Sequence, residues 1–135
     1  MKSDRQDSTR KDGKSVNVYR FERLIAWQRA VDFCVKAYKL TKSFPRDEAY
    51  GLTSQLRRAS ASIVLNIAEG SGSSSNKEFA QFLAIAVRSQ YEVVAILKLC
   101  ERLGYISPEV SQEMTAESSE VGKLVQGLKN SLSIG

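Results

Sequence analysis

The sequence contains no histidine, only two cysteines and only two prolines among its 135 residues. A structural zinc site normally takes four Cys or His ligands, so this composition excludes one, and no other cofactor is indicated. Cys34 and Cys100 lie among apolar residues in two different predicted helices, where we expect buried free thiols. The scarcity of proline, together with a hydrophobic content of 42%, fits a mostly helical globular protein.

Long hydrophobic runs are missing as well. No apolar run reaches the ~18 residues that a membrane span needs, and the N-terminal residues are too polar and charged for a signal peptide. We therefore expect a cytoplasmic protein with no membrane contact. A chain of 135 residues fits a single domain that buries its own core.

The charge is positive and unevenly distributed. The formal net charge is +5, and residues 1–58 hold 14 of the 20 Lys and Arg but only 7 of the 15 Asp and Glu. Such asymmetry is compatible with an anionic partner, nucleic acid above all. A charge of this size also serves simply to keep a small protein soluble, so both interpretations stay open.

Periodicity divides the chain into a tail and a helical domain. Residues 1–18 are charged and polar, and they cannot offset the entropy of ordering, so we expect a disordered tail. Residues 19–135 are expected to form the domain. Its helices are predicted at residues 21–44, 52–69, 75–103 and 107–132, with Gly70 beginning a C-terminal cap and loop. Short links between long helices predict an all-α, antiparallel up-down-up-down four-helix bundle.

The first predicted helix has more apolar surface than one bundle core requires. One stripe contains Leu24, Trp27, Val31, Cys34 and Tyr38, and a second contains Ala26, Ala30, Phe33, Ala37 and Leu40. Together the stripes cover more than half of the circumference, so we expect contact with another subunit. The alternative is that Tyr38 and the alanines are half exposed.

The second predicted helix carries an unusual polar stripe beside its apolar one. Amide, hydroxyl, guanidinium and carboxylate groups recur in this stripe at helical spacing. In the third predicted helix, Glu92 lies at the edge of an apolar stripe, and Arg58 is its expected partner. We favour a buried polar network that fixes helix register or a subunit contact over a ligand site. Its members are Gln55, Arg58, Ser62, Asn66, Glu69 and Glu92.

Several motifs resemble one bacterial family. They are Phe21, Trp27, Ala30, Tyr38 and Thr41, Phe44-Pro45, Tyr50-Gly51-Leu52, Gln55, Arg57-Arg58-Ala59, Ser62-Ile63, the segment Asn66 to Gly70, Phe79, Phe82-Leu83, Ser89, Glu92 and Leu103-Gly104-Tyr105. Over roughly residues 19–110 the chain is similar to the four-helix-bundle family associated with intervening sequences of 23S ribosomal RNA genes. The segment from Asn66 to Gly70, with its upstream Gln and Arg pair, is its most specific part.

The resemblance implies an antiparallel four-helix bundle that assembles into a homopentameric ring and carries an old label as a ribosome-associated protein. More distantly, the chain is similar to the accessory variability-determinant proteins of diversity-generating retroelements, which are helical rings that bind a reverse transcriptase and nucleic acid. Neither comparison supplies a catalytic residue. The pentamer agrees with the surplus apolar surface of the first helix.

These observations favour a non-enzymatic oligomeric module that binds RNA. The expected contacts are Arg29, Lys36, Lys39, Lys42 and Arg46, although solvated surface cations would look the same in the sequence. The alternative is a scaffold ring that binds a partner polypeptide, for example a reverse transcriptase, with nucleic acid incidental. Catalysis by Glu69 and Glu92 is disfavoured, because no histidine or nucleophile motif accompanies them, and no small-molecule substrate is evident.

Overall fold

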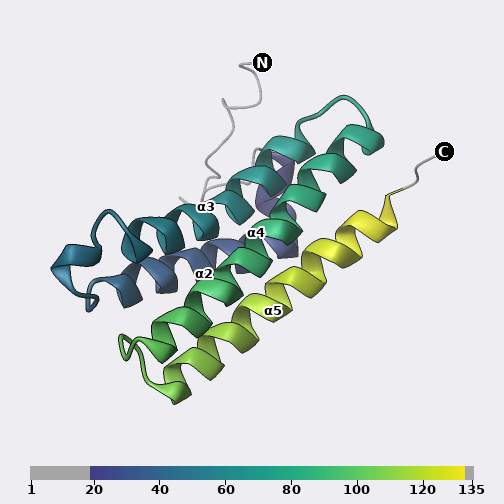
Figure 1. Ribbon diagram of the computed structural model, residues 1–135. Coiled ribbons are helices and arrows are strands. Elements are labelled where there is room, and N and C mark those ends of the chain that lie inside the picture. Colours follow the sequence, from purple (N-terminus) through teal and green to yellow (C-terminus); the bar gives the residue numbers. More distant parts are fainter. Residues whose placement is uncertain (1–18, 133–135) are drawn as a thin grey trace, which may run out of the picture.

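A computed structural model describes residues 19–132, and every regular element in that range is helical (Figure 1). Four long helices and two short 3-10 turns follow one another, so the predicted all-helical, four-helix class is confirmed. The predicted tail, residues 1–18, lies outside the described residues. The elements are η1 (Arg20–Arg23), α2 (Ile25–Thr41), η2 (Arg46–Glu48), α3 (Leu52–Ser71), α4 (Asn76–Arg102) and α5 (Pro108–Ser131).

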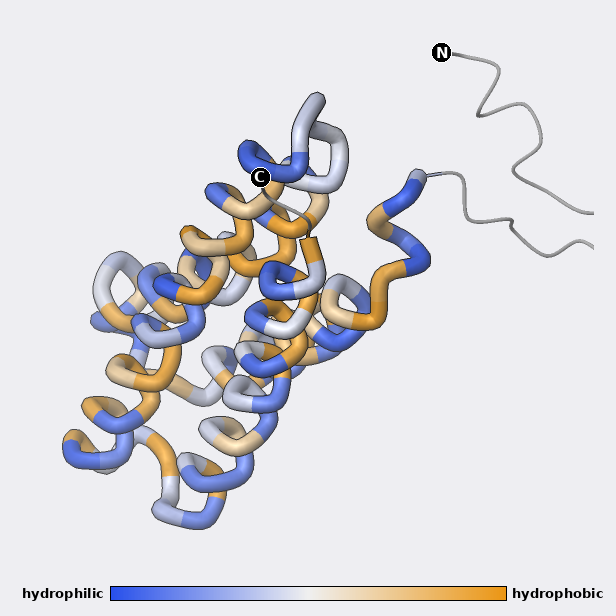
Figure 2. The backbone as a smooth tube through the Cα atoms, turned by 90° about the vertical axis from the view of Figure 1, so that its right-hand side faces the viewer, coloured by the Kyte–Doolittle hydropathy of each residue, from blue (hydrophilic) through white to orange (hydrophobic). Residues whose placement is uncertain are grey.

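The four long helices lie side by side in a bundle (Figure 1). α2 packs against α3 and α5, and α4 packs against the same two helices. Hydrophobic and hydrophilic residues alternate along every helix, as the tube in Figure 2 shows, so each helix contributes one face to a shared core. The largest fully buried side chains are Phe33, Phe79, Leu56, Ile63, Ile67, Leu83, Leu97, Val93, Val121 and Val125.

The first helix is shorter than the sequence predicts at both ends, because α2 begins at Ile25 and already ends at Thr41, three residues before Phe44. Residues 20–23 form a separate 3-10 turn, because the chain is extended at Leu24, with φ −79° and ψ 125°. The ring of Phe21 packs against Trp27, with centroids 4.9 Å apart, so the turn folds back on α2. The hydrophobic periodicity continues through this break, and periodicity alone could not locate it.

The core face of α2 is the stripe of small residues. Ala26, Ala30, Phe33 and Ala37 are buried, and all but Phe33 are alanines that allow close helix packing. Trp27, Val31 and Cys34 are half-buried, and the side chain of Tyr38 is 41% exposed. The bundle therefore buries the second predicted stripe except for Leu40, which is half-buried, and leaves the first stripe partly in water.

The helix cap lies within the segment Gly70 to Ser74, as the sequence predicts, but Gly70 itself is not the cap. α3 continues through Ser71 and is capped at Gly72, while Gly70 is buried inside the helix. A Cβ at Gly70 would lie 2.7 Å from Phe82 Cβ and 2.8 Å from Phe79 Cδ1. The absence of a side chain thus lets α4 approach α3 closely. The caps of the next two helices form as expected, since Ser75 Oγ accepts from the Glu78 backbone N–H and Ser107 Oγ from that of Val110, each at 3.1 Å.

One side-chain link joins the two connections at one end of the bundle. Glu48, at the end of η2, accepts a hydrogen bond from the Leu52 backbone N–H at 3.0 Å and from the Tyr105 hydroxyl at 2.8 Å. These two bonds hold the pKa of the Glu48 carboxyl below its usual value. The carboxylate therefore fixes the start of α3 against the turn between α4 and α5.

Between residues 19 and 132, each helix is either too short or too polar to traverse a lipid bilayer.

Candidate nucleic-acid interface

All five cations predicted to contact RNA are exposed. Arg29, Lys36 and Lys39 come from α2, Lys42 is the C-cap of that helix, and Arg46 begins η2. Because of their helical spacing, the first four of these cations follow one another around the outer side of α2, from the edge that faces α5 toward the edge that faces α3. The structure thus brings four of the five predicted cations together, in two groups with different surroundings, and Arg46 belongs to neither group.

The first group lies at the seam between α2 and α5. Arg29, Lys36 and Lys39 line a shallow hollow of about 500 Å³ together with Asp32 and Glu117. The Lys36 ammonium is 2.9 Å from a Glu117 carboxylate oxygen, and this hydrogen bond and the opposite charge raise the pKa of Lys36. Because two carboxylates offset most of the charge of these three cations, this group attracts phosphate weakly.

The second group lies where α2 faces α3. Lys39 and Lys42 line a hollow of about 410 Å³ with the half-exposed ring of Tyr38. The guanidinium of Arg57, from α3, stands over that ring at 4.8 Å from its centroid, and Arg57 Nε donates to Thr41 Oγ1 at 2.8 Å. An aromatic ring among three cations combines a stacking surface with phosphate-binding charge.

Sequence reasoning missed two residues of this group, because it placed Tyr38 only in an apolar stripe and did not assign Arg57 to the surface. Arg57 and Arg58 are adjacent in the sequence, but one residue of helix rotates a side chain by about 100°, so they point in different directions. Arg57 faces α2 and reaches Thr41, whereas Arg58 is exposed. The helical phase of Arg57 relative to the core residues was the signal available in the sequence.

The predicted polar stripe forms a network only in part. The hydroxyls of Ser62 and Ser89 are 2.8 Å apart and connect α3 to α4. Asn66 Nδ2 donates to Ser62 carbonyl oxygen at 2.8 Å and to Ser62 Oγ at 3.0 Å. This short network is half-buried and contributes to helix register.

The remaining members of the stripe do not join that network. Gln55, Arg58, Glu69 and Glu92 are exposed, and none of them makes a side-chain hydrogen bond or ion pair within residues 19–132. The predicted pair between Arg58 and Glu92 is therefore wrong for a single chain. Both groups lie on the outer sides of their helices, where water solvates them at no cost.

Exposed apolar residues flank these unpaired charges. Leu65 follows Arg58 by seven residues on α3, and Ile85 and Leu99 stand seven residues before and after Glu92 on α4. Seven residues are two helical turns, so each set shares one face. The exposed fractions of Leu65, Ile85 and Leu99 are 61%, 39% and 48%. The outer side of α3 and α4 is thus a mixed apolar and charged surface.

Within residues 19–132, no three His, Cys, Asp or Glu side chains gather as a metal site. The candidate acid and base, Glu69 and Glu92, are both exposed.

Comparisons with known proteins agree with an all-helical bundle of a defined family. Residues 22–127 match the 23S rRNA-intervening sequence protein family, and the chain belongs to that family. A similar crystal structure, at 1.70 Å resolution, is that of a protein with unknown function from the S23 ribosomal protein family of Bacteroides thetaiotaomicron. It is 25% identical, with a TM-score of 0.74, and the match covers 79% of this chain and 96% of that one. No curated protein matches the sequence significantly.

Proposed function

We propose that this protein is a non-enzymatic helical module that binds RNA through the α2 surface around Tyr38. The observation that carries the proposal is the group formed by Lys39, Lys42 and Arg57 around that half-exposed ring. Single-stranded RNA presents unstacked bases that stack on aromatic rings, with phosphates on either side for Lys and Arg. The names of the family and of its structural relative, which refer to 23S rRNA and to a ribosomal protein, support RNA as the ligand.

Charge reversal at this surface tests the proposal. Lys39→Glu with Lys42→Glu should weaken the binding of a single-stranded RNA more than tenfold at low salt. The slope of log K against log salt should become shallower by about 1.4, because each phosphate contact to a single strand contributes about 0.7. Fluorescence anisotropy across a salt series measures both quantities. Lys36→Glu should have a smaller effect, because Glu117 already neutralises Lys36.

The matched control is Lys77→Glu with Lys98→Glu. Both residues are exposed on α4, away from the α2 surface around Tyr38, and the double change alters the net charge by the same amount. Binding by this control should stay within threefold of the wild type. Equal losses in the two double variants would mean that only overall charge matters, and absence of binding at low salt would refute RNA as the ligand.

We further propose that the module is a homo-oligomer, with a homopentameric ring as the expected form. The exposed apolar residues of α3 and α4, with Arg58 and Glu92 unpaired between them, support an association surface. If Arg58 of one copy meets Glu92 of the next, Arg58→Glu or Glu92→Arg should each dissociate the assembly, and the double variant should restore it. Light scattering coupled to size exclusion measures the mass, and failure of the double variant to reassociate would exclude this contact.

The second candidate function is a scaffold that binds a partner polypeptide, as the retroelement resemblance implies. For either function we propose the cytoplasm as its location. The exposed fractions of Leu65, Leu99 and Leu103, between 48% and 61%, favour the scaffold, because apolar contact suits a protein better than a nucleic acid. Salt separates the two functions. Partner binding through apolar surface persists at high salt, whereas phosphate binding is lost.

A further inference from the structure

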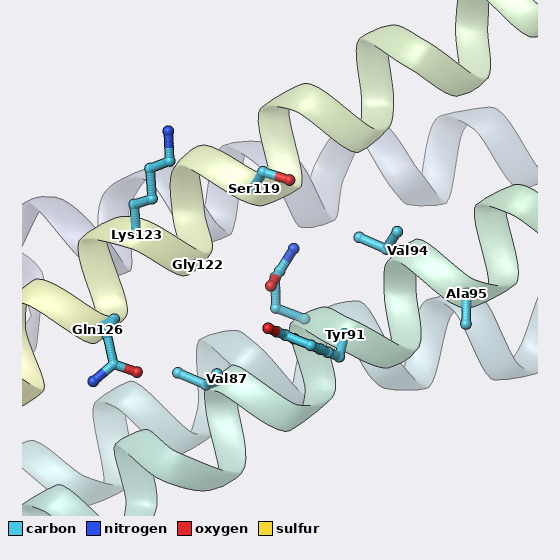
Figure 3. A pocket seen from close by; sticks show the side chains of 9 residues that line it. Val87, Tyr91, Val94, Ala95, Ser119, Gly122, Lys123 and Gln126 are labelled. Atoms are coloured by element: carbon cyan, nitrogen blue, oxygen red, sulfur yellow. The ribbon is translucent and has the colours of Figure 1, made fainter.

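A groove of about 570 Å³ lies between α4 and α5 (Figure 3). Its volume is within the range of about 300 to 1,000 Å³ that small-molecule sites occupy. Val87, Val94 and Ala95 of α4 provide apolar wall, and the phenol ring of Tyr91 lies across the groove. The groove takes no part in the RNA surface on α2.

The floor of the groove is the side-chain amide of Gln90. This side chain is only 6% exposed, yet it belongs to the lining. It fits beneath α5 because residue 122 is glycine, where an added Cβ would stand 2.7 Å from Gln90 Oε1. Gly122 therefore weakens the propensity of α5 for helix but creates the space for a buried amide.

The hydrogen bonds of Ser118 determine which end of the Gln90 amide faces the groove. Ser118 Oγ has one proton, and it donates that proton to the Thr115 carbonyl at 3.0 Å. Ser118 Oγ can therefore only accept from Gln90, whose Nε2 lies 3.3 Å away. The Gln90 amide nitrogen thus points at Ser118, and its carbonyl oxygen points toward Gly122, with no donor bonded to it among the described residues.

The rim of the groove is basic. Lys123 lines it from α5, and no Asp or Glu does. The ammonium of Lys123 stands 3.6 Å from Glu120, but both side chains are more than half exposed, and such pairs hold weakly. The flexible Lys123 side chain can therefore turn toward an anionic group in the groove. Apolar walls, a deep acceptor and a positive rim together define the complementary ligand.

We propose that this groove binds a small planar aromatic molecule that carries an N–H or O–H donor and an acidic group. The donor would reach Gln90 Oε1, the ring would lie between Tyr91 and the apolar wall, and the acidic group would lie near Lys123. Indole carboxylates and mononucleotides share this chemistry. The inference is independent of RNA binding by α2, because it uses other helices and other residues.

Four probes test the proposal on the full chain by ligand-observed NMR and calorimetry. Indole-3-acetate and guanosine 5′-monophosphate both have the donor and the acidic group. Whichever of them binds more tightly shows whether the ligand is an indole carboxylate or a mononucleotide. Naphthalene-1-acetate has the shape and charge of the indole but no N–H donor, and it should bind about threefold to tenfold more weakly. Indole-3-acetamide keeps the donor but lacks the charge, and it should also bind more weakly.

Three substitutions connect the affinity to the groove. Gln90→Leu should bring indole-3-acetate down to the affinity of naphthalene-1-acetate. Gly122→Ala should do the same, because the new methyl group displaces the flexible end of Gln90. Lys123→Gln should weaken the carboxylates and leave indole-3-acetamide unchanged.

Gly127→Ala is the matched control for Gly122→Ala. Gly127 lies on α5 as well, but nothing lies within 4 Å of an added Cβ. Both changes raise helix propensity equally, so only the change at Gly122 should reduce binding. The proposal is overturned if no probe binds, if the indole and the naphthalene acetates bind equally, or if Gly127→Ala weakens binding as much as Gly122→Ala.

Discussion

Replacement of Gly70 by alanine tests the closest approach between α3 and α4. The new Cβ would lie 2.7 Å from Phe82 Cβ and 2.8 Å from the Phe79 ring. The Cβ of Phe82 is attached to the backbone of α4, so it cannot move unless the helix moves. Phe79 is 1% exposed, and its ring has no free space to enter. The helices must therefore separate locally.

Two opposing contributions determine how far Gly70→Ala lowers the free energy of unfolding. Overpacking of a well-packed core costs about 1 to 3 kcal/mol, and rigid neighbours place this site in the upper part of that range. Alanine gains about 1 kcal/mol over glycine within a helix. The net destabilisation is therefore about 1 to 2 kcal/mol. With an unfolding entropy of about 2.1 cal/mol/K per residue, the melting temperature should fall by roughly 4 to 8 °C.

Thermal and urea unfolding followed by circular dichroism measure this change, with Gly127→Ala as the control. Residue 127 has open space around its added Cβ, so this variant should gain about 1 kcal/mol and melt at a higher temperature. The comparison isolates the packing term from the propensity term. A Gly70→Ala protein that melts as high as Gly127→Ala would refute the account of Gly70 as a packing glycine.

Three further outcomes are expected. Glu48→Gln should be less stable than the wild type at neutral pH. Because the folded-state pKa of Glu48 is lowered, this advantage of the wild type is fully present above the usual carboxyl pKa of about 4.3 and is lost as the pH falls toward the lowered value. Unfolding curves that differ equally at pH 7 and pH 3 would contradict the Glu48 link. Ser62→Ala removes the hydroxyl that contacts Ser89 and Asn66 and should cost about 1 kcal/mol in urea unfolding, a loss that Gln55→Ala, at an exposed position, should not reproduce. Burial raises the pKa of the Cys100 thiol to about 11, so Ellman's reagent should modify half-buried Cys34 first and Cys100 only as fast as the protein unfolds; prompt reaction of both thiols would show that the core opens there.

The helices could be predicted because their signals are local. Periodic apolar residues, the Ser75 and Ser107 caps and the Phe44-Pro45 stop each act within a few residues, and α4 and α5 begin where these signals place them. The break at Leu24 and the role of Gly70 were missed because both depend on contacts with residues that other segments supply, such as the packing of Phe82 on Gly70.

The candidate sites were harder to predict than the helices. The exposure of the α2 cations followed from their helical phase, but the neutralisation of Lys36 depends on Glu117, which lies 81 residues further along the chain. The α4–α5 groove was not predicted at all. Its key glycine looks unfavourable in the sequence, and its value appears only when Gln90 lies beneath it.

The cyclic order of the helices has a consequence for folding kinetics. α2–α3, α3–α4 and α4–α5 are contacts between consecutive helices, whereas the α2–α5 seam joins the two ends of the bundle. Short-range contacts form quickly, because little chain has to be closed into a loop. The domain should therefore fold rapidly from the α3–α4 hairpin outward, and the α2–α5 seam should close after the rate-limiting barrier. On this order of events Ser62→Ala, within the hairpin, slows refolding in stopped-flow experiments; if it accelerated unfolding alone, the hairpin would not be the nucleus.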